Sequence, residues 1–191
     1  MNSDLTKQLC QAIQSVPEAM ALLGLLQQLN LPNHYLAGGS VTQILWNQKL
    51  GLPALDKVND FDVVYFDREH DSEAHFQQLI DAHKRFAMPV DVVNQANVHT
   101  WYGKKHGNNI APHQTTEDGI RTWLPCFAVG VRLESVRLES SDELTVFAPY
   151  GLEDQANMII RPNKRTMRKE NYDAMNASFK ARWPMVSVLD W

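Results

Sequence analysis

The sequence predicts a mixed α/β domain, and three observations lead to that fold class. Leucines at helical spacing run through residues 5–31, whereas short apolar runs at 61–66 and 90–93 have the length of strands. A Gly-Gly-Ser turn at residues 38–40 joins a short apolar run to a helical pattern. No repeat, low-complexity segment or linker divides the chain. We therefore expect residues 1–191 to form one domain with a mixed sheet and flanking helices.

Composition agrees with this class and narrows the function. The 191 residues are 44% hydrophobic, which suits one domain with a buried core. A net charge of −4 argues against an extended nucleic-acid surface, since phosphate affinity comes mainly from dense Lys and Arg. Cys10 and Cys126 match no zinc or redox spacing and are expected to be buried thiols. Without a signal peptide pattern or a long apolar stretch, we expect a cytoplasmic protein with no membrane partner.

The elements of the first half follow from apolar spacing and turn residues. The stretch before Pro32 predicts two short helices or one broken helix, because Pro17 suits a first helical turn. Ser40 is a good N-cap for the helix after the glycine turn, and Gly51 closes that helix. The remaining predictions are strands at 35–37, 61–66 and 89–93, a loop at 52–59, and a helix that starts at Asp71 or Ser72.

The second half reads less regularly. Residues 94–113 are polar and carry two glycines, so no element is assigned there. A helix start at 116–118 leads to Trp123, and strands at 126–133 and 144–147 form a hairpin through a charged turn. The segment 161–183 is expected to be a C-terminal helical segment.

Three carboxylates have a spacing that suits metal chemistry. Side chains alternate along a strand, so Asp60 and Asp62 point the same way while Phe61 points into the core. Two adjacent carboxylates repel each other unless a cation compensates them. Asp91, on another predicted strand, would complete a site for two Mg²⁺ ions, with Mn²⁺ as an alternative, and for a nucleoside triphosphate.

The glycine turn adds a place for phosphate. Gly38 and Gly39 let the backbone approach a ligand closely, and the helix that starts at Ser40 offers N–H groups and the positive end of its dipole. The Ser40 hydroxyl is a candidate donor to a terminal phosphate.

These motifs resemble those of the nucleotidyltransferase superfamily with the DNA polymerase β-like fold. The resemblance rests on residues 36–40, 60–64 and 90–93, inside core motifs that span 34–94. Longer similarity to a family of small bacterial nucleotidyltransferase-like proteins covers most of the chain and is quoted from residues 93–102, 128–132, 148–152, 161–163 and 182–184.

The resemblance implies roles for individual residues. Asp60 and Asp62 would ligate both metals, Asp91 would ligate the ion on the acceptor side and help deprotonate the nucleophile, and the glycine turn with Ser40 would hold the triphosphate. One departure is the gap between Ser40 and Asp60, which is longer than the superfamily's common spacing. The loop at 52–59 must therefore bulge away or shape the pocket.

Other residues leave two interpretations open. Trp101 and Tyr102 would either stack on a base or acceptor or close the core. The histidines at 99, 106 and 113 fit surface or capping roles better than metal binding. Arg161 and Lys164, with the arginines at 165 and 168, form a basic cluster that would either face phosphate or be a solvated helix start.

The leading function is a metal-dependent nucleotidyltransferase that moves a nucleoside monophosphate from a triphosphate to an acceptor hydroxyl or phosphate. The acceptor would be a small molecule, an RNA end or a protein. The alternative is a catalytically weak nucleotide-binding regulator or a toxin–antitoxin-type interaction protein with the same fold. A purely structural interaction protein, which would bind no nucleotide with magnesium, is a third reading.

Overall fold

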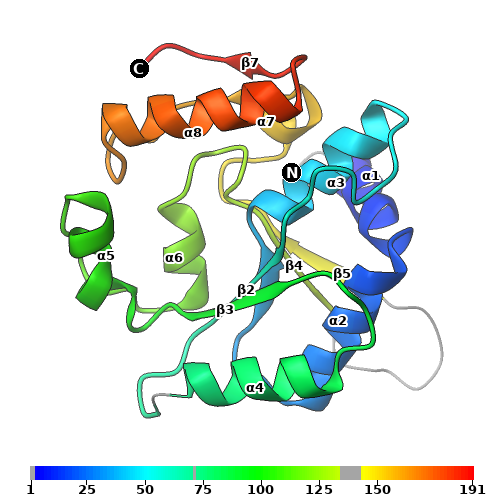
Figure 1. The fold of residues 1–191 in the computed structure, drawn as a ribbon, viewed down its shortest axis with the longest axis vertical. Coiled ribbons are helices and arrows are strands. Elements are labelled where there is room, and N and C mark those ends of the chain that lie inside the picture. The colour runs from blue at the N-terminus through cyan, green and yellow to red at the C-terminus, as the bar shows by residue number, and fades with distance from the viewer. Residues whose placement is uncertain (1–2, 71, 134–142) are drawn as a thin grey trace.

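The computed structural model describes residues 3–70, 72–133 and 143–191, which fold around a five-stranded sheet (Figure 1). The helices are α1 (Ser3–Gln14), α2 (Pro17–Gln28), α3 (Gly39–Lys49), α4 (Glu73–His83), α5 (Val98–His106), α6 (Thr116–Arg121), α7 (Glu153–Ala156) and α8 (Lys169–Arg182). The strands are β1 (Tyr35–Ala37), β2 (Phe61–Tyr65), β3 (Val90–Asn94), β4 (Gly130–Leu133), β5 (Leu144–Phe147), β6 (Ile159–Ile160) and β7 (Ser187–Val188). The predicted mixed α/β class is confirmed.

The strand order β3-β2-β1-β4-β5 places the two strands that carry the predicted carboxylates side by side. β2 and β3 are parallel and are joined through α4, whereas β1 runs antiparallel to both β2 and β4. β4 and β5 pair antiparallel, which confirms the predicted hairpin. The charged turn predicted between them lies outside the described residues.

Alternation along the strands gives the sheet two different faces. Leu36, Phe61 and Val63 point toward α1, α2 and α3 and belong to the main hydrophobic core. Tyr35 and Val64 point the other way, where they pack with side chains of α6 and the segment after it. Asp62 alternates with Phe61 and Val63, so its side chain lies on this second face.

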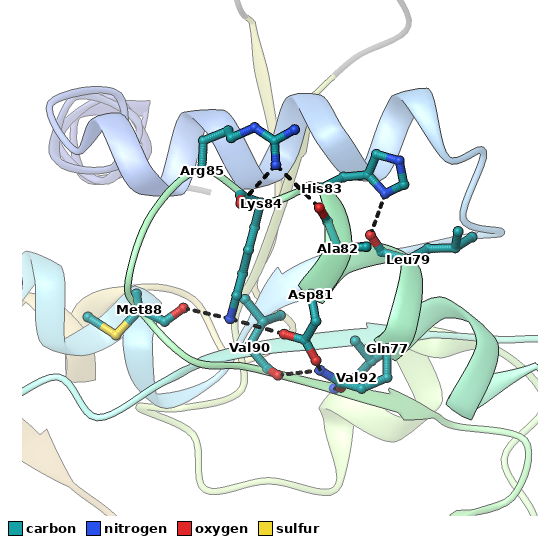
Figure 2. A network of polar contacts seen from close by, with 10 residues as sticks. All are labelled: Gln77, Leu79, Asp81, Ala82, His83, Lys84, Arg85, Met88, Val90 and Val92. Atoms are coloured by element: carbon teal, nitrogen blue, oxygen red, sulfur yellow. Dashed lines mark hydrogen bonds and ion pairs between the residues drawn. The ribbon is translucent and has the colours of Figure 1, made fainter.

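The edge strand β3 is held by side chains of α4 (Figure 2). The Gln77 amide nitrogen donates to the Val90 carbonyl at 2.9 Å, and the Gln77 carbonyl oxygen accepts from the Val92 N–H at 3.0 Å. The Glu73 carboxylate accepts from the Asn94 N–H at 2.8 Å. β3 carries Asp91 and has no neighbouring strand on its outer edge. On that edge, the contacts from α4 take the place of strand pairing.

A second core joins α3 to the C-terminal part of the chain. Trp46 of α3 packs edge-on against Phe179 of α8 and against Trp183. The Trp46 indole N–H donates to the Gln155 carbonyl at 2.9 Å, and the Trp183 indole N–H donates to the Asn47 side chain at 2.8 Å. The predicted C-terminal helical segment is present, but its long helix begins at Lys169.

In the second half of the chain, several elements differ from the sequence prediction. The polar stretch 94–113 contains α5, which was not predicted because its glycine and polar side chains give no amphipathic pattern. Gly107, with a φ of 79°, caps the end of this helix. The strand predicted to start at Cys126 starts at Gly130, because the amides of Phe127 and Ala128 bond back to the Leu124 carbonyl in a turn. The very short elements α7, β6 and β7 were not predicted.

The N-terminal pattern is confirmed as two helices, with Pro17 in the first turn of α2. Within the described residues, no helix alone is long and apolar enough to cross a membrane, although α1 and α2 pass that test as a pair bent by 92°. Cys126 is buried and Cys10 partly buried, and both are free thiols, as expected.

Candidate functional site

The structure brings the three predicted carboxylates to one region of the sheet. Asp62 and Asp91 are direct partners across the parallel strands β2 and β3, and Asp60 lies one residue before β2. Phe61, between Asp60 and Asp62, is fully buried in the main core. Asp62 is partly buried, whereas Asp60 and Asp91 are exposed.

The carboxyl of Asp62 has a strongly shifted pKa. Burial, followed by the charges of Asp60 and Asp91, raises the pKa of the Asp62 carboxyl to about 7. The Gly39 N–H donates to this carboxylate and partly offsets the rise. Among the ion pairs of the described residues, none involves these three carboxylates. The region therefore concentrates negative charge that no ion pair of the described residues neutralises.

This donor set fits a divalent cation that is shared with a substrate. No three Asp, Glu, His or Cys side chains of the described ranges converge closely enough to hold a metal ion by themselves. Mg²⁺ in nucleotide sites takes oxygen ligands, commonly one or two carboxylates together with substrate phosphates and water. Asp62 and its two acidic neighbours offer oxygen donors of this kind.

The glycine turn lies directly against Asp62. Gly38 has a φ of 75°, and a Cβ there would stand 3.3 Å from an Asp62 carboxylate oxygen and 3.1 Å from the Trp123 ring. The Gly38 N–H donates to the Val129 carbonyl at 2.9 Å, so Gly38 links β1, the carboxylate and the segment before β4. Glycine is required here by both the backbone angle and the close approach.

Ser40 does not cap the helix, and that prediction was wrong. Gly38, with a positive φ, holds the N-cap position, so the cap lies two residues earlier than predicted and α3 begins at Gly39. Ser40 therefore lies in the first turn, buried, and its hydroxyl donates to the Ala37 carbonyl at 3.4 Å. The first amides of a helix lack acceptors within it, so this end of α3 remains suitable for phosphate.

A cavity of about 440 Å³ opens beside Asp62 on the second face of the sheet. Its walls come from the glycine turn, β2, β3, α5, the segments around α6, and α8. The lining includes Gly38, Gly39, Asp62, Val64, Val93, Gln95, Val98, Trp101, Tyr102, Lys105, His106, His113, Thr122, Trp123, Leu124, Phe127, Met167, Met175 and Phe179. Figure 1 shows α5 and α6 beside each other, with α8 running above them.

Comparison with known proteins identifies the family and the fold to which this site belongs. A protein-family model described as nucleotidyltransferase matches residues 24–188. The chain belongs to this nucleotidyltransferase family. Among solved structures, the chain is similar to one described as "The NMR structure of the protein reveals a CCA-adding enzyme head domain", with 23% identity and a TM-score of 0.72. The alignment covers 96% of this chain and 95% of that chain, which shows a shared fold. No curated protein matches the chain.

The long loop of this nucleotidyltransferase bulges away from the cavity. The Asn47 side-chain amide donates to the carbonyls of Ala54 at 3.0 Å and Asp56 at 2.7 Å. Lys57 donates through its ammonium group to the Arg182 carbonyl at 3.0 Å. The loop at 52–59 is thus held against α3 and α8 and contributes no side chain to the cavity lining.

The two aromatic residues and two of the three histidines line the cavity. Trp101 and Tyr102 are half-buried on α5, and the Tyr102 hydroxyl donates to the Thr166 carbonyl at 3.2 Å. His106 packs against Tyr102 with ring centroids 4.5 Å apart. His113 is 7% exposed, so it is buried in the cavity wall and not at the surface. The sequence around these residues is polar and has no periodic pattern, so it did not indicate that they share one cavity.

The four basic residues of the cluster do not line the cavity, although Met167 beside them does. The Arg161 guanidinium makes two 3.0 Å hydrogen bonds to the Asp154 carboxylate, which raises the pKa of Arg161. Lys164 lies over the Trp191 ring, with its nitrogen 5.9 Å from the ring centroid. Neither Arg161 nor Lys164 lines the cavity, and their phosphate-binding role stays a prediction.

Arg182 was not singled out by sequence reasoning, although it stands in one of the segments that carried the family resemblance. Burial lowers the pKa of its guanidinium, and the charge of Asp60 acts in the opposite direction. Its Nη1 donates to the Lys57 carbonyl at 3.1 Å, while its buried Nε has no hydrogen-bond partner. Arg182 therefore places a positive charge within electrostatic range of Asp60.

Proposed function

We propose that this nucleotidyltransferase transfers a nucleoside monophosphate from a nucleoside triphosphate to an acceptor hydroxyl or phosphate, with release of pyrophosphate. Family membership implies the triphosphate as a substrate. The observation that carries the metal-dependent form of this proposal is Asp62, a partly buried carboxylate whose pKa is raised to about 7 beside two further acids. We propose the cytoplasm as the compartment.

Each residue has a separate task in this proposal. Asp60, Asp62 and Asp91 would hold Mg²⁺ or Mn²⁺, which supplies charge neutralisation of the triphosphate and activation of the attacking oxygen. The Gly39 N–H orients the Asp62 carboxylate. The first turn of α3 binds phosphate oxygens through its backbone amides. Asp91 takes the acceptor side and accepts the proton of the acceptor hydroxyl.

Thermal unfolding with each of the four ribonucleoside triphosphates tests the proposal. In wild type we expect a magnesium-dependent rise in Tm, because a ligand that binds only the folded state stabilises it. Asp62→Ala should lose that rise. Asp67→Ala is the matched control, since Asp67 follows the same strand and is absent from the cavity lining.

Release of pyrophosphate decides between transfer and mere binding. A screen of hydroxyl and phosphate acceptors with the preferred triphosphate should give pyrophosphate in wild type and none in Asp91→Asn. Nucleotide binding without pyrophosphate from any acceptor would favour the regulator. If no triphosphate shifts the Tm of wild type, the metal-dependent reaction is wrong.

A further inference from the structure

The cavity next to Asp62 has an aromatic wall that the proposed phosphate chemistry does not use. Trp101 and Tyr102 reach it from α5, and Trp123 reaches it from the segment after α6. Rings of this kind stack on nucleobases, because every base has a π-face. Such stacking contributes substantially to the binding free energy. The volume of about 440 Å³ lies in the range of small-molecule sites.

The cavity is continuous with the place proposed for the triphosphate. Gly38, Gly39 and Asp62 belong to its lining, and the Trp123 ring comes within 3.1 Å of where a Gly38 Cβ would stand. A ligand with its phosphates at the glycine turn would therefore place its uncharged part in this cavity. Asp60 and Asp91 are not part of the lining, so the acceptor side of the carboxylates lies elsewhere.

His113 gives the cavity a polar side chain without a partner. It is 7% exposed, and neither ring nitrogen makes a hydrogen bond of standard geometry. Burial lowers the pKa of His113, an effect that Asp118 and the Gln95 backbone partly offset, so the ring is neutral at pH 7. A neutral imidazole has one donor and one acceptor, which suits the edge of a nucleobase. Leaving a buried polar group unpaired is costly, so a ligand that pairs with His113 would gain binding energy.

We infer that this cavity binds the nucleobase of the donor triphosphate, with Trp101 as a stacking surface and His113 as a residue that distinguishes bases. The inference rests on the proposed function, since that function places the triphosphate at the glycine turn. Its two halves can be probed separately, because a nucleoside lacks phosphates and inorganic tripolyphosphate lacks a base.

The first experiment measures the two probes by calorimetry. Wild type should bind at least one of adenosine, guanosine, cytidine and uridine without metal, and tripolyphosphate with Mg²⁺. Trp101→Leu should raise the nucleoside Kd about tenfold and leave the tripolyphosphate Kd unchanged. The control is Trp191→Leu, since Trp191 packs on Tyr172 outside the cavity lining and should change neither Kd.

The second experiment tests selectivity. His113→Leu should bring the four nucleoside Kd values toward one another, whereas a purely structural role would weaken all four by the same factor. His113→Gln keeps a polar side chain and is used for the same selectivity measurement if His113→Leu does not fold. His75→Leu, at an exposed position on α4, should leave the four values unchanged.

The outcomes separate the two proposals. Tripolyphosphate binding without nucleoside binding, or nucleoside binding that Trp101→Leu leaves intact, overturns the nucleobase cavity and leaves the proposed function standing. Nucleoside binding that Trp101→Leu weakens about tenfold, with the tripolyphosphate Kd unchanged, supports the cavity. If tripolyphosphate with Mg²⁺ binds neither wild type nor Asp67→Ala, the proposed function fails, whatever the nucleosides do.

Discussion

At the scale of single residues, Asp62 combines burial with two acidic neighbours, so its charged form destabilises the folded protein. Its pKa is raised from 3.8 to about 7, which means that the folded state holds this proton more tightly than the unfolded state. Stability should therefore fall as pH rises from about 4 to about 7 and level off above that. The ionised Asp62 carboxylate that would bind a cation therefore lowers the stability of the folded protein while no ligand is bound.

Asp62→Asn should raise the stability of the metal-free protein at pH 8 by about 1–3 kcal/mol, because it removes the buried charge and keeps an acceptor for the Gly39 N–H. The gain should be smaller at pH 5. Urea denaturation at both pH values measures it.

The control for this prediction is Asp67→Asn. Backbone N–H groups of Glu69 and His70 donate to the Asp67 carboxylate, and its pKa is lowered. Its ionised form is favoured by folding, so this variant should not gain stability at pH 8. Equal gains in both variants would mean that the burial and acidic neighbours of Asp62 are not the cause.

At the scale of elements, the site depends on a turn and an edge strand whose geometry leaves little freedom. The turn needs a positive φ at Gly38 and close contact with Asp62 and Trp123. The strand β3 has a neighbouring strand on one edge and is held on the other edge by Gln77 and Glu73. The turn positions Asp62, and the strand positions Asp91.

Gly38→Ala should destabilise the protein by about 1–3 kcal/mol, because alanine disfavours a φ of 75° and its Cβ would press on the Trp123 ring. Gly24→Ala is the matched control. Gly24 lies in α2 with nothing within 4 Å of an added Cβ, so this change should stabilise by about 0.5–1 kcal/mol. Thermal unfolding of both variants would show opposite shifts in Tm; a matching shift would contradict the strain at Gly38.

Gln77→Ala should loosen β3, because the Val92 N–H and the Val90 carbonyl lose their partner (Figure 2). We expect a loss of about 1–2 kcal/mol in stability and faster hydrogen exchange at the Val92 amide. His83→Ala, on the same helix and exposed, should leave exchange at Val92 unchanged. Unaltered exchange in Gln77→Ala would show that water replaces the glutamine without loss.

At the scale of the whole molecule, α3 connects the two hydrophobic cores and the C-terminal part of the chain. Ile44 packs in the main core while Trp46 packs in the second core with Phe179 and Trp183. Asn47, fully buried at the end of α3, donates to the 52–59 loop and accepts from the Trp183 indole. The two cores should therefore unfold together.

Asn47→Ala should destabilise the protein by about 2–4 kcal/mol, since it removes three hydrogen bonds and leaves the buried Trp183 N–H unpaired. Urea transitions followed by tryptophan fluorescence and by circular dichroism should shift together. Asn157→Ala, at an exposed asparagine that bonds locally to the Glu153 carbonyl, should shift neither. Separate midpoints in the Asn47 variant would show that the cores unfold independently.

Local patterns in the sequence were enough for the α/β class, the strands β1, β2 and β3, and the two N-terminal helices. Alternation alone predicted that Phe61 is buried while Asp62 faces away from the main core, because a strand has a period of two. The glycine turn was also readable, since two successive glycines before a helix are a local feature. The motifs further supplied the family resemblance that the family model confirms.

Tertiary structure decided everything that depends on contacts between distant segments. The pairing of Asp62 with Asp91 comes from the parallel register of β2 and β3, and the cavity comes from α5, α6 and α8 meeting over the sheet. Trp101 and His113 lie in stretches without periodicity, so no local pattern could place them in one wall. Sequence thus determined which groups are available for chemistry, whereas long-range packing decided which of them meet, because burial and pairing are properties of the folded chain alone.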